Sequence, residues 1–143
     1  AVLIVDEPTA GLDPEERVRF RNLLCETAQD RIVLLSTHIV GDIEATCNEI
    51  AVMDKGRILY RGTVEALNQM VEGKVYTAQI SRRELPGMKE KYPVTEIHSA
   101  GNNVQIRFLA EEFPFKGAVS CQAGTEDAYL YLMEKKAGER IVL

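Results

Sequence analysis

The sequence predicts an α/β fold in two parts, a parallel sheet with helices followed by a small α+β domain. Two apolar runs, 1–5 and 31–36, flank a stretch with helical signals, which is the strand, helix, strand order of a βαβ unit. Beyond Gly73, shorter strand signals surround two helical ones, as in an α+β domain. The charge changes at the same place, because 1–73 hold 7 basic and 13 acidic residues whereas 74–143 hold 10 and 9. We therefore expect two domains, 1–73 and 74–143.

The first part is expected to alternate strands and helices. Residues 1–5 form an uninterrupted apolar run, typical of a strand buried on both faces of a parallel sheet. Asp13 is expected to cap a helix that begins at Pro14, because aspartate accepts backbone N–H bonds at helix starts and proline suits the first helical position. The elements expected after it are a strand at 31–36, a helix at 37–48, a hairpin of 49–53 and 57–60, and a short helix at 63–70.

The second part is expected to hold four strands and two helices. A glycine-asparagine-asparagine turn at 101–103 separates two of the strands. The last helix is expected to be capped by Thr125. The strands are expected at 74–80, 94–99, 104–109 and 118–122, and the helices at 85–91 and after Thr125.

The composition excludes several classes of protein. The net charge is −5, and neither half is basic enough to predict nucleic acid as a partner. No apolar run approaches the roughly 20 residues of a membrane-spanning helix. Three cysteines without a CxxC pair indicate neither a disulfide framework nor a zinc site.

Two consecutive carboxylates, Asp6 and Glu7, follow the first apolar strand. Ligands of α/β sheets gather beyond the carboxyl ends of strands, and paired acids there can serve a magnesium shell and an attacking water. An isolated pair of this kind more often begins a solvated loop. Here the pair belongs to a longer pattern, since DEPTAGLDP at 6–14 is followed by STH at 36–38 and by DKGRILYRG at 54–62.

Together these three blocks closely resemble the nucleotide-binding domain of ATP-binding cassette (ABC) transporters, over 1–70. The resemblance implies the C-terminal part of a P-loop NTPase sheet that uses ATP and Mg²⁺. It implies that Asp6 ends the Walker B strand and serves the metal through water, and that Glu7 is the catalytic carboxylate that orients or deprotonates water. It also implies that 10–13, with Asp13, form a D-loop facing the opposite subunit, and that His38 contacts the γ-phosphate.

Some of these residues have a simpler interpretation as well. His38 alone would more often cap the following helix, and only its place one strand after the acid pair favours the catalytic role. Asp13 can cap a helix and face a partner at once. Gly11 is expected to supply a backbone conformation that a Cβ would hinder. His98 has no companion His, Cys or paired acid nearby in the sequence and is expected to be structural or exposed and not catalytic.

The family's phosphate loop, GxxxxGK[ST], and its LSGGQ signature segment do not occur in the 143 residues. We expect both to lie upstream of Ala1 and the chain to be the C-terminal piece of a longer ATPase. Alone it is expected neither to bind nor to hydrolyse ATP. Its two apolar strands are then expected to lack covering layers and to expose apolar surface, which favours a homodimer or larger assembly through the first part.

The second part resembles the C-terminal extension of ATPases from bacterial ABC-2 type exporters, through GTEDAYL at 124–130, although Thr125 replaces the family's leucine. The resemblance implies an exporter ATPase that acts with a transmembrane permease and a second ATPase subunit. It implies a cytoplasmic protein held at the inner face of the membrane through the permease. Two alternatives remain: a non-catalytic regulatory or dimerisation module, and a DNA-repair or chromosome-maintenance ATPase of the same superfamily.

Overall fold

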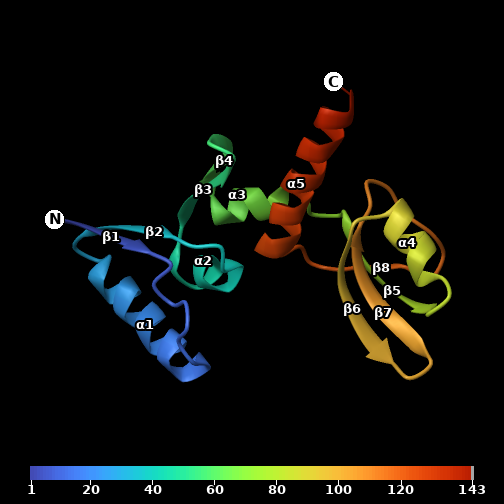
Figure 1. The fold of residues 1–143 in the computed structure, drawn as a ribbon, viewed down its shortest axis with the longest axis horizontal. Helices are drawn as coiled ribbons and strands as arrows, with labels where there is room; N and C mark the ends of the chain where they lie inside the picture. Colours follow the sequence, from blue (N-terminus) through green and yellow to red (C-terminus); the bar gives the residue numbers. More distant parts are fainter. Residues whose placement is uncertain (143) are drawn as a thin grey trace. The chain divides into compact units, whose positions relative to one another are not determined.

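The structure is a computed structural model that describes residues 1–142, with side chains described through Lys136. It is a mixed α/β chain (Figure 1). It separates into two compact units, Ala1–Ile50 (unit 1) and Ala51–Leu143 (unit 2). The domain division expected at Gly73 stays a prediction. Within the described part of the chain, no helix is both long and apolar enough to cross a bilayer.

Unit 1 begins with a strand, a helix and a strand: β1 (Val2–Asp6), α1 (Pro14–Thr27) and β2 (Ile32–Ser36). The two strands pair in parallel, with Asp6 opposite Ser36 at their carboxyl ends. Asp13 caps α1, because its carboxylate accepts a hydrogen bond from the Glu16 N–H at 2.8 Å. The predicted βαβ unit and its helix cap are therefore confirmed.

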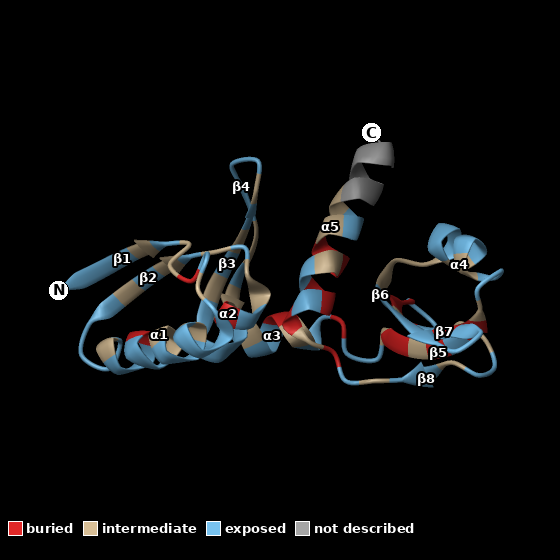
Figure 2. Ribbon diagram, turned by 60° about the horizontal axis from the view of Figure 1, so that its bottom comes forward, coloured by how far each residue is buried: buried red, intermediate tan, exposed pale blue. Residues whose placement is uncertain are grey.

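The faces of β1 and β2 are exposed, in contrast to what their apolar composition alone predicts. The side chains of Val2 and Ile4 are 61% and 70% exposed, and that of Ile32 is 68% exposed. Figure 2 accordingly colours both strands as exposed or intermediate throughout. A parallel strand buries both faces only where helices and neighbouring strands cover it. The exposed apolar surface expected of these strands in this chain is thus present.

The second helix is shorter than predicted. Helix α2 spans Val40–Thr46 and not 37–48. The residues before it are held in an extended loop, since the Thr37 hydroxyl accepts a hydrogen bond from the Ile39 N–H at 3.0 Å and the His38 N–H donates to Glu7. The backbone of Ile39 is extended (φ −90°, ψ 100°), so the helix begins only at the next residue, Val40.

The hairpin and the short helix after it are confirmed. They are β3 (Glu49–Asp54), β4 (Arg57–Thr63) and α3 (Val64–Gln69). The turn consists of Lys55 and Gly56, both with positive φ (49° and 77°), as a tight hairpin turn requires. The hydroxyl of Thr63 caps α3 by accepting a hydrogen bond from the Ala66 N–H at 3.0 Å.

The rest of unit 2 is a four-stranded antiparallel sheet with two helices, ordered β6-β7-β5-β8. The predicted number and order of elements are confirmed, but the last strand is two residues long and not five. The elements are β5 (Val75–Ser81), α4 (Leu85–Lys91), β6 (Val94–Ala100), β7 (Asn103–Leu109), β8 (Val119–Ser120) and α5 (Thr125–Val142).

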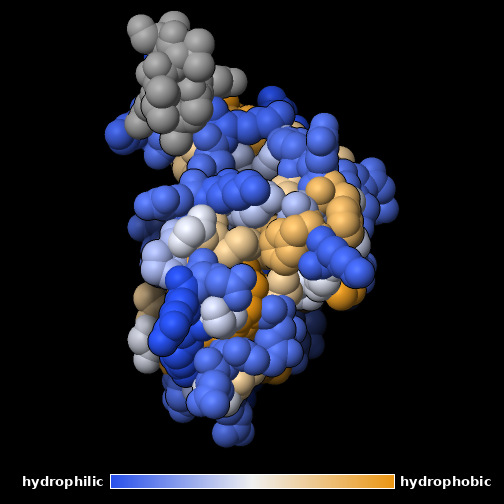
Figure 3. Space-filling model, turned by 90° about the vertical axis from the view of Figure 1, so that its right-hand side faces the viewer, coloured by the Kyte–Doolittle hydropathy of each residue, from blue (hydrophilic) through white to orange (hydrophobic). Residues whose placement is uncertain are grey.

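The core of unit 2 lies on one face of this sheet. Alternate residues of β5 and β7 point into it, including Ile80, Ile106 and the fully buried Phe108, while Leu85 and Met88 of α4 pack against them. Figure 2 shows most of the buried residues on β5, β7 and the start of α5. On the face drawn in Figure 3, hydrophilic side chains cover most of the surface, with hydrophobic patches between them.

An ion pair fastens α5 to the sheet. The Arg107 guanidinium on β7 donates from Nε to Asp127 Oδ1 at 3.0 Å and from a terminal nitrogen to Oδ2 at 2.5 Å. It also donates to the Gln122 carbonyl at 2.9 Å, and Asp127 accepts the Gly124 N–H at 2.9 Å. The first helical bond, from the Ala128 N–H, ends at the carbonyl of Gly124. Gly124 is therefore the cap residue, and the helix begins one residue later, at Thr125; the prediction that Thr125 is the cap is wrong.

Candidate active site

The predicted site residues gather where β1 and β2 end. Because the two strands are parallel and in register, their carboxyl ends lie at the same edge, with Asp6 opposite Ser36. The Ser36 hydroxyl donates a hydrogen bond to the Asp6 carboxylate, and the Glu7 N–H donates to the Ser36 carbonyl at 2.7 Å. Residues 6 and 7 are thus fixed against the start of the segment that carries His38.

Glu7 contacts both residues that follow Ser36. Its Oε2 accepts a hydrogen bond from the Thr37 hydroxyl at 3.0 Å. Its Oε1 accepts the backbone N–H of His38 at 3.0 Å and lies 2.8 Å from Nδ1 of the same residue. The structure therefore brings Glu7 and His38 together, as expected of side chains that follow neighbouring parallel strands.

The backbone of Glu7 is unusual. Its φ is +46°, in the left-handed region that non-glycine residues rarely occupy and that costs about 1–3 kcal/mol. Strained backbone of this kind persists where surrounding bonds hold it, and here the bonds to Ser36, Thr37 and His38 do so. The conformation turns the Glu7 carboxylate toward the end of β2.

These contacts also set the charge of Glu7. The hydrogen bond with the His38 ring, and then those from the Thr37 hydroxyl and the His38 N–H, lower the pKa of the Glu7 carboxyl below its ordinary value. The carboxylate is therefore ionised at neutral pH and can only accept hydrogen bonds. About a third of the Glu7 side chain and most of the His38 ring are exposed, so both are open to water and to a ligand.

Asp13 and Gly11 lie in the loop between β1 and α1. The cap interpretation of Asp13 is confirmed by its bond to Glu16, whereas contact with a second subunit stays a prediction. Gly11 has a φ of +80° with open space around it, so its backbone conformation and not a close neighbour requires glycine. This confirms the role expected for Gly11.

Sequence reasoning missed a buried cluster that holds the same loop. Thr9 and Asp42 are each 1% exposed, and the Thr9 hydroxyl donates to the Asp42 carboxylate. The Arg21 Nε of α1 donates to the same carboxylate at 2.6 Å. Asp42 therefore joins the loop after Glu7 to α1 and α2. Thr9 lies inside the DEPTAGLDP block, but nothing in the sequence pointed to its partner, which is 33 residues away.

Ser36 and Thr37 lie in the STH block at 36–38, but the sequence predicted no role for either of them. Their contacts with Asp6 and Glu7 follow from strand register, which could have predicted them.

His98 lies on β6, where its Nε2 is 3.2 Å from Glu96 Oε2 and its side chain is 72% exposed. It is exposed, as expected. Among the described residues, no group of three His, Cys, Asp or Glu side chains could hold a metal ion.

Comparison with known proteins identifies the family. No family model matches the chain. The chain is 33% identical to the uncharacterized ABC transporter ATP-binding protein YxlF of Bacillus subtilis, over 64% of the chain and 30% of that protein. It is 32% identical to YhcH of the same organism, over 79% of the chain and 37% of that protein. The chain belongs to the ABC transporter ATP-binding proteins.

A third ABC relative is matched along nearly the whole chain. The Nod factor export ATP-binding protein I of Neorhizobium galegae is 30% identical over 92% of the chain and 41% of that protein. The chain spans less than half the length of these three relatives. Because this match extends across both units, unit 2 as well as unit 1 resembles an ABC ATP-binding protein.

Proposed function

We propose that this ABC chain contributes the catalytic carboxylate and the switch histidine to an ATP-hydrolysing site that drives export through a membrane partner. The observation that carries the proposal is the contact of Glu7 with His38 and Thr37 at the shared edge of β1 and β2. Phosphoryl transfer depends on positioned charge, and this edge holds an ionised carboxylate and an imidazole in contact.

In the proposed mechanism Glu7 orients the attacking water and accepts its proton. An ionised carboxylate with bonds from Thr37 and His38 is held in one position, and its exposed fraction leaves room for a water. The pKa of Glu7 is lowered in this arrangement, so as a base it depends on geometry more than on basicity.

His38 links Glu7 to the γ-phosphate in this proposal. An ionised carboxylate cannot donate, so the proton of the Glu7–His38 contact resides on Nδ1 of His38. For Nε2 to donate to a phosphate oxygen at the same time, the ring must carry both protons. The proposed role therefore needs the imidazolium form of His38.

The donor chemistry at the end of β1 fits Mg²⁺. Magnesium is held in nucleotide sites by one or two carboxylates, by waters and by substrate phosphates, and not by an all-protein cage. Asp6, with the Ser36 hydroxyl beside it, offers hard oxygen ligands of this kind. Asp6 would hold the ion through water, and the ion would neutralise phosphate charge when bound.

The remaining assignments concern the whole protein. We propose that 1–73 belong to the ATPase domain and 74–143 to an accessory domain. The partners would be a transmembrane permease and a second ATPase subunit, with the loop around Asp13 facing that subunit. The protein would lie in the cytoplasm at the membrane. The export role rests on the name of the matched relative from Neorhizobium galegae, which is a Nod factor export ATP-binding protein.

The test uses a chimaera in which this chain replaces the segment that it matches in that relative. Glu7→Gln in the chimaera should keep Mg-ATP binding but lower turnover about 10²- to 10⁴-fold, because the amide cannot accept the proton. Glu15→Gln removes an exposed carboxylate from α1 and should leave turnover unchanged. Hydrolysis by the Glu7→Gln chimaera at the parental rate would refute the assignment.

A further inference from the structure

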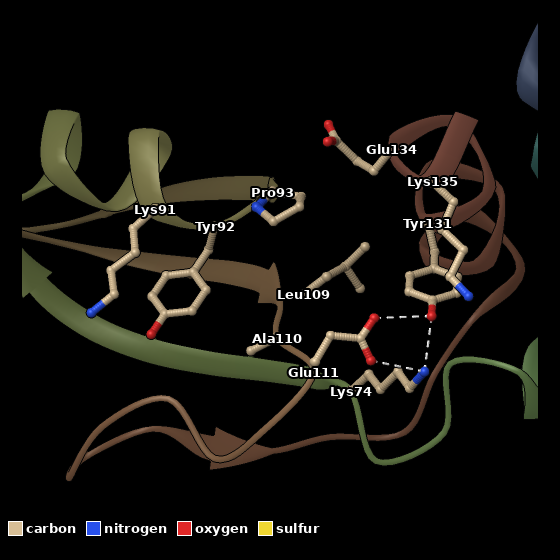
Figure 4. Close-up of a pocket in the computed structure, with 10 residues that line it drawn as sticks. All are labelled: Lys74, Lys91, Tyr92, Pro93, Leu109, Ala110, Glu111, Tyr131, Glu134 and Lys135. Carbon is tan, nitrogen blue, oxygen red and sulfur yellow. Dashed lines mark hydrogen bonds and ion pairs between the residues drawn. The ribbon is translucent and has the colours of Figure 1, made fainter. Parts of the chain in front are cut away.

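Unit 2 contains a hollow of about 360 Å³, which lies within the size range of small-molecule sites. Its residues come from the end of α4 and the segment that follows it, from the end of β7 and the segment that follows it, from Lys74 just before β5, and from α5 (Figure 4). The side chains of Tyr92, Pro93, Leu109 and Ala110 form an apolar wall. All the residues that line it belong to unit 2.

One side of the hollow holds a closed polar network. The Lys74 ammonium donates to the Tyr131 hydroxyl at 2.9 Å and pairs with Glu111 Oε2 at 3.1 Å. The Tyr131 hydroxyl in turn donates to Glu111 Oε1 at 3.0 Å, which completes the triangle drawn in Figure 4. These bonds raise the pKa of Lys74 and lower that of Glu111, so both are charged and neutralise each other. The charged and polar groups of the network therefore have hydrogen-bond and ion-pair partners without a ligand.

Two other lysines line the hollow without an ion pair. Among the residues whose side chains are described, neither Lys91 nor Lys135 lies within ion-pair distance of a carboxylate. Both contact aromatic rings: Lys91 Nζ lies 5.6 Å from the centre of the Tyr92 ring, and Lys135 Nζ lies 4.9 Å from that of Tyr131. In Figure 4 the two lysines stand at opposite sides of the hollow.

The charge of the lining favours an anion. Three lysines and two glutamates line the hollow, and one of each is used in the network. The remaining Lys91, Lys135 and Glu134 give a net charge of one positive. A cationic ligand is disfavoured further, because the Lys74 and Lys135 ammonium groups already lie 4.7 Å and 4.9 Å from the centre of the Tyr131 ring.

We propose that this hollow binds a small organic monoanion, a carboxylate carried on an apolar or aromatic body. The body packs on Tyr92, Pro93 and Leu109, and the carboxylate lies in the positive field of Lys91 and Lys135. An inorganic anion would leave the apolar wall uncovered, and a neutral ligand would leave both ammonium groups unmatched. The inference rests on unit 2 alone and does not depend on the proposed ATPase function.

The test is a titration of the complete chain with 1-naphthoate, followed through backbone amide resonances by ¹H–¹⁵N NMR. We expect saturable shifts at Leu109 and Ala110 with a dissociation constant of about 1 mM or below. The neutral isostere 1-naphthamide and inorganic phosphate should bind about three- to tenfold more weakly, because each matches only part of the site. Residue-resolved shifts separate this binding from any on the exposed strands of unit 1.

Matched lysine variants distinguish the hollow from general charge attraction. Lys91→Gln with Lys135→Gln should weaken 1-naphthoate binding about three- to tenfold, the effect expected when two exposed positive charges near the carboxylate are removed. Lys89→Gln with Lys116→Gln removes the same charge outside the hollow and should leave binding unchanged. Equal weakening by both pairs, equal binding of the amide, or no saturable shift at Leu109 and Ala110 would each overturn the proposal.

Discussion

Replacing Asp127 by asparagine should destabilise unit 2 strongly. Asp127 is 4% exposed and accepts three hydrogen bonds, two from the Arg107 guanidinium and one from the Gly124 N–H. In Asp127→Asn one of these acceptors becomes an NH₂ group that faces donors, and the partly buried Arg107 loses its counter-charge. Breaking a buried ion pair costs about 3–5 kcal/mol. Because the Arg107 side chain is 22% exposed, we expect the lower end, about 3 kcal/mol.

Urea denaturation followed by tyrosine fluorescence measures this loss. The chain has no tryptophan, and all five tyrosines lie in unit 2, so the signal reports on that unit. With a slope of about 1.5 kcal/mol per molar urea, the midpoint should fall by about 2 M. Glu126→Gln changes the exposed neighbour on the same helix turn and should shift the free energy of unfolding by less than about 0.5 kcal/mol.

A double-mutant cycle decides whether the loss comes from the pair. Arg107→Gln combined with Asp127→Asn should be more stable than the sum of the two single losses predicts, because the second change removes the charge left unmatched by the first. If the two losses simply add, or if Asp127→Asn shifts the midpoint no more than Glu126→Gln, then the ion pair does not hold α5 to the sheet and the reasoning is wrong.

Three further predictions concern charge, ligand binding and association. Lys74 lowers the pKa of the Glu111 carboxyl, so the pair adds stability above pH 4.5 that is lost as the pH falls through the lowered pKa. In Glu111→Gln the stability of unit 2 should therefore fall less steeply below pH 4.5. An unchanged dependence of stability on pH would contradict this. Calorimetric titration of the 143-residue chain with Mg-ATP should show no micromolar binding, because its sequence holds no phosphate loop, and such binding would overturn our view of the site. Light scattering at low micromolar concentration should show a dimer or larger assembly. Each exposed apolar side chain of β1 and β2 would gain about 1.5–3 kcal/mol of free energy on burial, which favours association. A stable monomer would refute this.

Much of the fold could be predicted from local signals. Apolar runs mark β1 and β2, the turn at 101–103 marks the boundary between β6 and β7, and Asp13-Pro14 marks the start of α1. The helix boundary that was predicted wrongly depends on contacts with residues distant in the sequence. Helix α2 begins at Val40 and not at residue 37, because the residues before it are extended and contact distant partners, such as Glu7 through the His38 N–H. The helix preferences of the residues in this segment give no information about such distant partners.

The exposure of β1 and β2 shows another limit of local reasoning. An apolar run predicts that a strand can be buried, whereas actual burial depends on what covers the sheet. Within the described residues, β1 and β2 form a two-stranded sheet, so Val2 and Ile4 remain exposed. The same run would be buried if further strands and helices flanked it.

The candidate site could be predicted in its main residues but not in its supports. Asp6, Glu7 and His38 follow two successive strands, and parallel register brings them together. The Thr9–Asp42 contact joins positions 33 residues apart, and neither residue type at that spacing carries a recognisable pattern. The positive φ of Glu7 was also beyond sequence reasoning, because glutamate seldom adopts it.

The most direct test of the central claim asks whether Glu7 and His38 act as one catalytic unit. Turnover of Mg-ATP is measured in the chimaera with the Neorhizobium galegae relative for Glu7→Gln, for His38→Ala and for both together, with His98→Ala as the matched control. Residues that act together show non-additive losses. We expect the double variant to be no slower than Glu7→Gln alone and His98→Ala to match the parent, whereas losses that multiply, or an undiminished rate in His38→Ala, would contradict the account.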